Sequence, residues 1–203
     1  MQRLVGAHWP ELRELRLGHL RIGSEGAAAL QAAAWPRLEY LDLASTDINA
    51  ACLAAASLPS LLKLKLTGND LGGGGAAELV SGQWPKLQQL WLRECNLGHG
   101  SAAVLAAGAW PDLEGLDLSD NFLLDGAAAL SGGAWPKLQE LYLASNYIGE
   151  AGALGLSTGD WPELHVLQLA DNRVGGGSML WFKATGPNLG SSCFRLINSH
   201  LMR

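Results

Sequence analysis

A short motif that returns every 23 to 26 residues constrains the fold of this chain more than any other feature. All eight prolines occupy one slot of the repeat, and six of the eight tryptophans stand directly before a slot proline. A fixed period of this length indicates a protein built from stacked copies of one structural unit. The slot prolines are Pro10, Pro36, Pro59, Pro85, Pro111, Pro136, Pro162 and Pro187.

Each unit predicts a short strand followed by a short helix. Leucines alternate with other residues in segments such as Leu64-Lys65-Leu66, and this period of two turns one face of a strand inward. Ala-rich segments follow, for example GAAELVSG from Gly75, and alanine favours a helix. The proline then separates helix from strand, because it fixes its own φ and biases the preceding residue away from helical geometry.

Strands that alternate with helices at such short spacing are parallel, and each unit is too small to bury its own leucines, so we expect the units to stack. The pattern Leu-x-x-Leu-x-Leu-x-x-Asn/Cys-x-Leu resembles the leucine-rich repeat family; it is found at residues 87–97, 113–123 and 138–148. The long unit resembles the ribonuclease-inhibitor-like subfamily, with Gly-Ala-x-x-Leu segments at Gly26, Gly75 and Gly126. The resemblance implies an α/β fold, a curved right-handed leucine-rich-repeat solenoid with parallel strands on the concave face and short helices on the convex face.

We predict a single leucine-rich-repeat domain over residues 1–203. Seven repeats start near residues 9, 35, 58, 84, 110, 135 and 161, and a degenerate repeat occupies residues 186–203. The segment before Trp9 aligns with the end of the helical segment before Trp84, so the chain begins inside a repeat without a capping unit. We therefore expect a fragment of a longer solenoid, a truncated gene model, or self-association through the uncapped N-terminal edge.

One slot after each strand predicts a buried structural ladder. An asparagine in this slot can donate hydrogen bonds from its amide to carbonyl groups of the neighbouring unit and accept others, which satisfies backbone that turns a corner in the interior. Thr46 and Cys95 are variants that the family pattern also tolerates, whereas Leu20 in the first unit departs from it and the second unit is three residues short around Asn49 to Leu53. The ladder residues are Asn69, Cys95, Asn121, Asn146 and Asn172.

The outward positions of the strands are where binding residues are expected, because they can vary without disturbing the stack. Trp91, Asp117 and Tyr142 occupy consecutive rungs of one outward column. Exposed aromatic residues ringed by acidic ones are typical of a protein-binding hot spot, whereas the alternative is a solvated face with scattered aromatics. The surrounding candidate residues on the concave face are Arg93, Glu94, Asp120, Phe122, Glu140 and Tyr147.

Charge is distributed unevenly along the strand face. Four of the five basic residues counted on it lie before Trp84, and six of the nine acidic ones come after it. We therefore expect a protein partner to place a Lys- or Arg-bearing segment against the C-terminal half, with Trp91 and Tyr142 supplying apolar area and cation–π contact.

Composition and motifs argue against other classes of site. The net charge of -5 has the wrong sign for binding nucleic acid or an anionic membrane, and no apolar run approaches the roughly 20 residues that span a bilayer. The five histidines lack metal-ligand spacing, and no Cys-x-x-Cys occurs. The G-x-S-x-G match at residues 155–159 lies before a strand rather than after one, which is the wrong context for a nucleophile. We expect no catalytic residue, no metal and no cofactor.

The sequence thus favours a non-enzymatic protein-protein interaction module, a scaffold that binds its partner on the concave strand face. Two alternatives stay open: a regulator of an enzyme, such as a GTPase activator or an inhibitor of the ribonuclease-inhibitor-like branch, and a structural subunit of a cytoskeletal or axonemal assembly. Three cysteines, odd in number and far apart, favour a reducing compartment, and the first ten residues lack a signal peptide's hydrophobic stretch. We expect a cytoplasmic location or, under the structural alternative, the cytoskeleton or the cilium axoneme.

Overall fold

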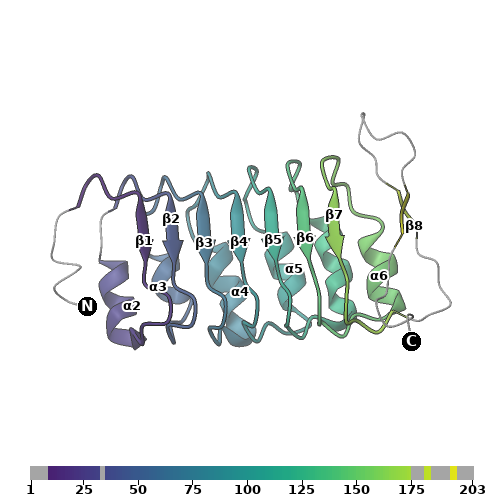
Figure 1. The fold of residues 1–203 in the computed structure, drawn as a ribbon, viewed down its shortest axis with the longest axis horizontal. Helices are drawn as coiled ribbons and strands as arrows, with labels where there is room; N and C mark the ends of the chain where they lie inside the picture. The colour runs from purple at the N-terminus through teal and green to yellow at the C-terminus, as the bar shows by residue number, and fades with distance from the viewer. Residues whose placement is uncertain (1–8, 33–34, 175–180, 184–192, 196–203) are drawn as a thin grey trace.

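Seven three-residue strands form one open parallel sheet in chain order, and the helices lie in a second layer behind it (Figure 1). The structure is a computed structural model that describes residues 9–32, 35–174, 181–183 and 193–195. The strands are β1 (Glu14–Arg16), β2 (Tyr40–Asp42), β3 (Lys63–Lys65), β4 (Gln89–Trp91), β5 (Gly115–Asp117), β6 (Glu140–Tyr142) and β7 (Val166–Gln168). The helices are α2 (Gly23–Gln31), α3 (Ala51–Ala54), α4 (Gly72–Val80), α5 (Ser101–Ala106), α6 (Glu150–Leu156) and the 3-10 helix η1 (Leu124–Gly132).

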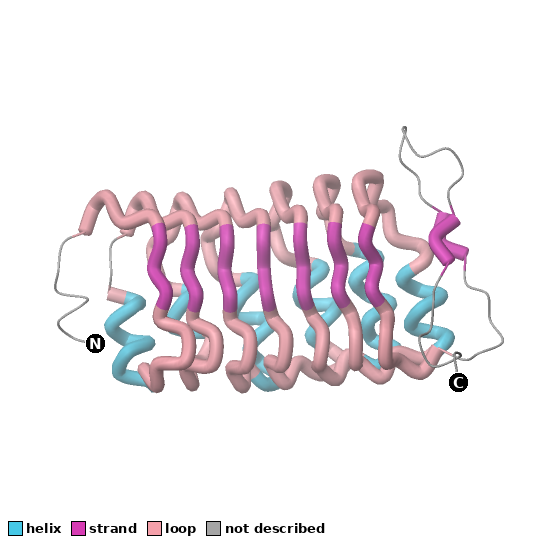
Figure 2. Tube along the Cα trace, in the orientation of Figure 1, coloured by secondary structure: helices cyan, strands magenta, loops and turns pink. Residues whose placement is uncertain are grey.

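Each strand pairs with the next in strict register, so equivalent residues of successive repeats lie side by side (Figure 2). The central leucine of every strand points inward, and those of β2 to β6 are fully buried. At the two ends of the sheet, Leu15 and Leu167 are only partly buried, because each has a neighbouring repeat on one side. This arrangement is the right-handed α/β solenoid that the repeat predicts.

The tryptophans before the slot prolines fill the space between sheet and helices. Trp84, Trp110 and Trp135 are each 1% exposed, and Trp35 and Trp161 are also buried. Glycine stands two residues before four of these rings, and an added Cβ there would lie 2.6 to 2.8 Å from a ring carbon. The ring therefore packs directly on the glycine backbone, which explains a Gly-x-Trp-Pro motif at Gly82, Gly108, Gly133 and Gly159.

The predicted asparagine ladder is hydrogen-bonded throughout, and it is buried at Asn69, Asn121 and Asn146 and partly buried at Asn172. Asn121 Oδ1 accepts hydrogen bonds from the N–H groups of Cys95 and Leu97 in the preceding repeat, both at 3.0 Å. Its Nδ2 donates to the carbonyl oxygens of Leu92 at 2.8 Å and Leu118 at 2.9 Å. Each asparagine thus joins two repeats through their backbones. Equivalent bonds are made by Asn69, Asn146 and Asn172.

Two other side chains occupy the same slot with fewer bonds. Thr46 Oγ1 donates to the Leu43 carbonyl at 2.7 Å, and the buried Cys95 thiol donates to the Leu66 carbonyl at 3.3 Å. Leu20 is 51% exposed in the first repeat and takes no part in the ladder. The first two repeats, which lack an asparagine in this slot, therefore make fewer ladder hydrogen bonds than the repeats that have one.

Two segments differ from the expected geometry. Residues 124–132 form a 3-10 helix rather than an α-helix. They lie close to both neighbouring repeats, since an added Cβ at Gly126 would sit 2.1 Å from the His99 carbonyl and one at Gly155 would sit 2.3 Å from the Ala128 Cβ. The narrower 3-10 helix fits this confined space.

The predicted degenerate repeat at 186–203 falls mostly outside the described residues. Its described part, β9 (Cys193–Arg195), pairs antiparallel with β8 (Trp181–Lys183) in a separate two-stranded sheet. The parallel sheet accordingly ends at β7 among the described residues, and β9 adds no eighth strand to it. The uncapped segment predicted before Trp9 also lies outside the described residues.

The contact between glycine and tryptophan predicts that an added methyl group destabilises the fold at one glycine and not at its neighbour. Gly133→Ala places a Cβ 2.7 Å from the buried Trp135 ring and should lower the free energy of unfolding by about 1–3 kcal/mol through overpacking. Gly132→Ala is the matched control, since no atom lies within 4 Å of its added Cβ. Urea unfolding of both variants would measure the difference, and equal midpoints would contradict the packing role.

The ladder predicts a second difference in stability. Asn121→Ala and Asn146→Ala leave buried backbone groups without hydrogen-bond partners, so each should lower the free energy of unfolding by about 1–3 kcal/mol. Gln139→Ala serves as the surface control, because its amide bonds only the exposed Glu163 carboxylate at 3.3 Å. Urea unfolding midpoints that fall equally in all three variants would be incompatible with a buried ladder.

Candidate functional site

The strand face consists of the outward side chains of β1 to β7, arranged in columns along the stack. The first residue of each strand contributes one column and the third residue contributes another, because both flank the inward leucine. The first column is Glu14, Tyr40, Lys63, Gln89, Gly115, Glu140 and Val166. The third-residue column is Arg16, Asp42, Lys65, Trp91, Asp117, Tyr142 and Gln168.

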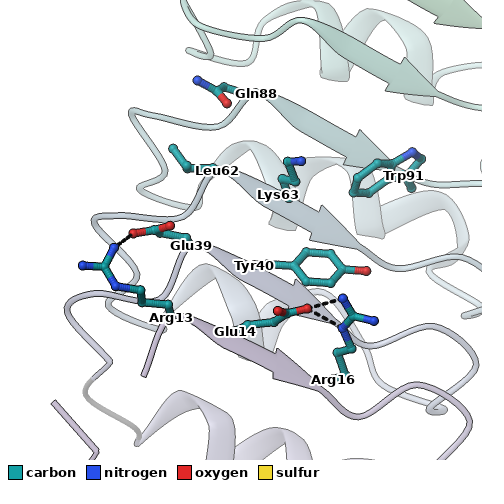
Figure 3. A pocket seen from close by; sticks show the side chains of 9 residues that line it. All are labelled: Arg13, Glu14, Arg16, Glu39, Tyr40, Leu62, Lys63, Gln88 and Trp91. Atoms are coloured by element: carbon teal, nitrogen blue, oxygen red, sulfur yellow. Dashed lines mark hydrogen bonds and ion pairs between the residues drawn. The ribbon is translucent and has the colours of Figure 1, made fainter. Parts of the chain in front are cut away.

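A depression of about 710 Å³ opens on the strand face over β1 to β4 (Figure 3). Its residues come from both columns and from the positions just before the strands. Apolar groups meet charged ones in it, which suits a partner side chain with both kinds of surface. The lining residues are Arg13, Glu14, Arg16, Glu39, Tyr40, Leu62, Lys63, Gln88 and Trp91.

Trp91 contributes to this depression through an aromatic contact. Its ring meets that of Tyr40 edge to face, with centroids 6.5 Å apart and planes at 81°. The guanidinium carbon of Arg16 lies 5.3 Å from the Tyr40 ring centroid in a cation–π arrangement. Residues of β1, β2 and β4 are thereby joined across the face, with β3 between the two rings.

The charges around the depression are paired except for one lysine. Arg13 binds Glu39 and Arg16 binds Glu14, as the dashed lines in Figure 3 show. Lys63 is exposed, lies on the strand between those of Tyr40 and Trp91, and has no carboxylate within ion-pair distance among the described residues. The depression therefore offers one cation that is available to a partner.

The C-terminal half of the strand face is acidic. Asp117 lies beside both Trp91 and Tyr142 in the register of the sheet. The Tyr142 hydroxyl donates to Glu140 at 3.2 Å. Desolvation raises the pKa of Tyr142 above its ordinary value of 10.0, and the hydrogen bond and charge of Glu140 and then the charge of Asp117 raise it further. No basic side chain lies within ion-pair distance of Asp117, Glu140 or the neighbouring Glu114 in the part of the chain that the structure describes.

Three predicted binding residues at the end of β4 and β5 pair with one another. Arg93 Nε lies 2.8 Å from Asp120 and 3.8 Å from Glu94. Arg93 and Glu94 are more than half exposed and Asp120 is 31% exposed, so solvent screens the contacts and they contribute little to stability. They leave one positive charge shared between two carboxylates at the rim of the strand face.

Phe122 and Tyr147 lie in the turns after the ladder residues and stack on each other. Their rings are parallel to within 8°, with centroids 5.9 Å apart, and the Arg173 guanidinium lies 4.9 Å from the Tyr147 centroid. Both aromatic side chains stay exposed, at 51% and 44%. Tyr147 also has a left-handed backbone with φ of 58°, an uncommon conformation for a bulky residue.

The structure therefore separates the aromatic residues that the sequence analysis grouped together. Trp91 contacts Tyr40 rather than Tyr142, and Phe122 contacts only Tyr147 among the aromatic rings of the described residues. The consecutive rungs Trp91, Asp117 and Tyr142 are confirmed by the register. The sequence analysis missed the depression and its aromatic partner Tyr40, although the alternation of inward and outward residues gives Tyr40 an outward position.

The described residues contain no cluster of side chains that could hold a metal ion. No helix among them is long and apolar enough to cross a bilayer. Burial raises the pKa of Cys52 to about 11 and that of Cys95 to about 12, so both thiols are neutral near pH 7 and poor nucleophiles.

A family model described as Leucine Rich repeat matches residues 57–80. No curated protein sequence matches the chain significantly. The plant peptide hormone receptor RGFR1 in complex with RGF2 superposes with a TM-score of 0.50 at 20% identity, over 84% of this chain and 30% of the receptor. The present chain thus spans less than a third of that receptor's length.

Two bacterial structures are also similar. Internalin C2 from Listeria monocytogenes has a TM-score of 0.49 at 20% identity, over 79% of this chain and 73% of its own. A leucine-rich-repeat protein from Leptospira interrogans has a TM-score of 0.47 at 23% identity, over 81% of this chain and 50% of its own. Repeat pattern, strand topology and family model together identify the fold as a leucine-rich-repeat solenoid.

The acidic surroundings of Tyr142 predict a measurable shift in its ionisation. Glu140→Gln removes a negative charge that opposes formation of the tyrosinate, so the pKa of Tyr142 should fall toward its ordinary value. NMR titration of ring-labelled tyrosine would follow Tyr142 separately from Tyr40 and Tyr147. Glu78→Gln on α4, in the helix layer, should leave the pKa unchanged, and an equal fall in both variants would argue against a local effect.

Proposed function

Because the chain is a leucine-rich-repeat protein whose outward strand residues can vary without disturbing the core, we propose that it is a non-enzymatic interaction module that binds a protein partner on the strand face. The observation that carries this proposal is the position of Trp91. A tryptophan stands on the open face of the sheet and lines a depression in which Tyr40 and Leu62 lie among charged residues. Interface hot spots have this composition.

Trp91 differs from the tryptophans of the Trp-Pro slot. Those in repeats two and four to seven are buried against the sheet, whereas Trp91 is partly exposed and packs on Tyr40 at the surface. Covering Trp91 with a partner would remove its remaining apolar area from water. A large rigid ring contributes such area at a small cost in side-chain entropy, so Trp91 is the expected anchor of the interface.

The acidic C-terminal half supports a partner with a basic segment. Asp117 and Glu140 carry charges that no described basic side chain neutralises, and Tyr142 lies next to each of them, opposite Asp117 on the neighbouring strand and two residues after Glu140 on its own. A Lys or Arg side chain of the partner could contact both carboxylates and the Tyr142 ring. Such charges mainly raise the rate of association and favour the correct partner.

We further place the repeats in the ribonuclease-inhibitor-like branch and the protein in the cytoplasm. The nine-residue helices α2 and α4 coincide with Gly-Ala-x-x-Leu segments of the kind found in that branch, although the equivalent segment in η1 is a 3-10 helix. The buried, unpaired thiols of Cys52 and Cys95 are compatible with a reducing compartment. The helix segments support the assignment to this branch, and the thiols support the assignment to the cytoplasm.

The proposed interface predicts a loss of partner binding in a double variant. Trp91→Ala combined with Tyr142→Ala should strongly reduce the proteins recovered in a crosslinking pull-down from cell extract. With a purified partner, Trp91→Ala alone should weaken binding by about 2 kcal/mol, or roughly 30-fold, as expected of a buried aromatic anchor. Glu114→Gln, at the rim, should change affinity by about 1 kcal/mol or less.

A control variant separates the strand face from the helix layer. Leu154 on α6 is 59% exposed and lies away from the strand columns, so Leu154→Ala should recover the same proteins as the unaltered chain. Circular dichroism would first establish that every variant is folded. Equal recovery by the unaltered chain and the Trp91/Tyr142 variant would locate the binding surface elsewhere.

A further inference from the structure

The two ends of the strand face carry unpaired charges of opposite sign. Its depression over β1 to β4 contains three basic residues and two acidic ones, and the two guanidinium groups are already paired. Lys63 is the cation left over. Over β5 and β6, by contrast, Asp117 and Glu140 have no ion-pair partner among the described residues. A partner that satisfies the whole face must therefore supply both signs of charge.

Lys63 is placed to bind a carboxylate beside an apolar group. It lies in the first column between Tyr40 and Gln89, beside the paired Tyr40 and Trp91 rings, with Leu62 next to it along the chain (Figure 3). A partner side chain that fills the depression would exclude water from around the ammonium group. An ion pair gains strength when water is excluded, so an acidic residue next to an apolar one fits this end best.

Strand spacing fixes the distance between the two charge sites. Lys63 is on β3, Asp117 is on β5, and Glu140 is on β6 in the same column as Lys63. Two to three spacings of about 4.8 Å correspond to roughly 10–14 Å. Gly115, between Gln89 and Glu140 in that column, is covered by the Gln89 carboxamide, whose Oε1 would lie 2.1 Å from an added Cβ, so a peptide crossing the strands passes over this flexible amide. An extended peptide advances about 3.3 Å per residue, so it covers this distance in three to four residues.

We infer that the strand face binds an extended, bipolar peptide segment that crosses the strands. An Asp or Glu of the segment contacts Lys63, an adjacent apolar side chain enters the depression against the Tyr40–Trp91 pair, and a Lys or Arg three to four residues away contacts Asp117 and Glu140. This inference rests on the proposed interaction function and adds the sequence pattern of the partner and its position along the stack.

Selection from a displayed library of random twelve-residue peptides tests the pattern. The 203-residue chain is the bait, and peptides that also bind Trp91→Ala are discarded. The expected peptides carry an acidic residue beside an apolar one, three to four residues from Lys or Arg. Fluorescence anisotropy with a labelled synthetic copy should show binding about fivefold weaker to Lys63→Glu than to the unaltered chain, as for a charge pair at the surface.

Charge reversal on both sides makes the test specific. A peptide whose acidic residue is changed to lysine should bind Lys63→Glu more tightly than it binds the unaltered chain. Lys86→Glu is the matched control, because Lys86 is exposed but does not line the depression. It should leave the affinity of the original peptide unchanged apart from a general effect of net charge, which the salt dependence of both variants measures.

Two results would overturn the inference. Trp91-dependent peptides that bind Lys63→Glu and the unaltered chain equally well would remove the acidic contact while leaving the interaction function intact. A selection that yields no Trp91-dependent peptide would exclude a linear segment as the partner, and the pull-down with the Trp91/Tyr142 variant would then decide the interaction function by itself.

Discussion

A turn after each strand sets the geometry of the whole stack, and from the second repeat onward a side chain in the ladder slot closes this turn by bonding the backbone. In every repeat the residue before the ladder slot has a left-handed backbone, from His19 in the first repeat to Asp171 in the seventh. This conformation is unfavourable for most residues other than glycine. In the third, fifth, sixth and seventh repeats the asparagine that follows compensates by bonding backbone groups of two repeats at once. Because the turn is the same each time, the strands stay in register, and the register in turn aligns the outward columns.

Much of this fold could be predicted from the sequence because its signals are periodic. Alternating leucines located all seven strands, and the Trp-Pro slot located the buried rings. The motif Gly-x-Trp-Pro was also readable, but its meaning depends on how closely the ring of Trp135 approaches the backbone of Gly133, which is a packing distance. The 3-10 form of η1 could not be read from its composition, because it results from crowding by α5 and α6 on either side. Residues 186–203 have no clear period, and the antiparallel pairing of β9 left no signal in the repeat.

For the candidate site, the sequence predicted only which residues form the outward columns of the strand face. Alternation tells which side chains face outward, and register tells which are neighbours, so the sequence of rungs through Trp91, Asp117 and Tyr142 followed directly. Contacts across the columns depend on side-chain rotamers instead. The Trp91 ring reaches past β3 to Tyr40, two strands away, although Asp117 is nearer in register. No sequence pattern contains this diagonal contact, and both of its rings line the depression.

The same scaffold therefore carries two chemically different halves without a change in its core. In the N-terminal half, arginines and glutamates on neighbouring positions neutralise one another, so that shape and aromatic surface dominate there. In the C-terminal half the carboxylates near Tyr142 stay unpaired, and the negative potential they create is felt by its hydroxyl. Because the backbone repeats from one strand to the next, the two ends of the strand face differ chiefly in these side chains. An asymmetric partner would consequently be oriented by charge, with the aromatic contact at Trp91 supplying affinity between the two ends.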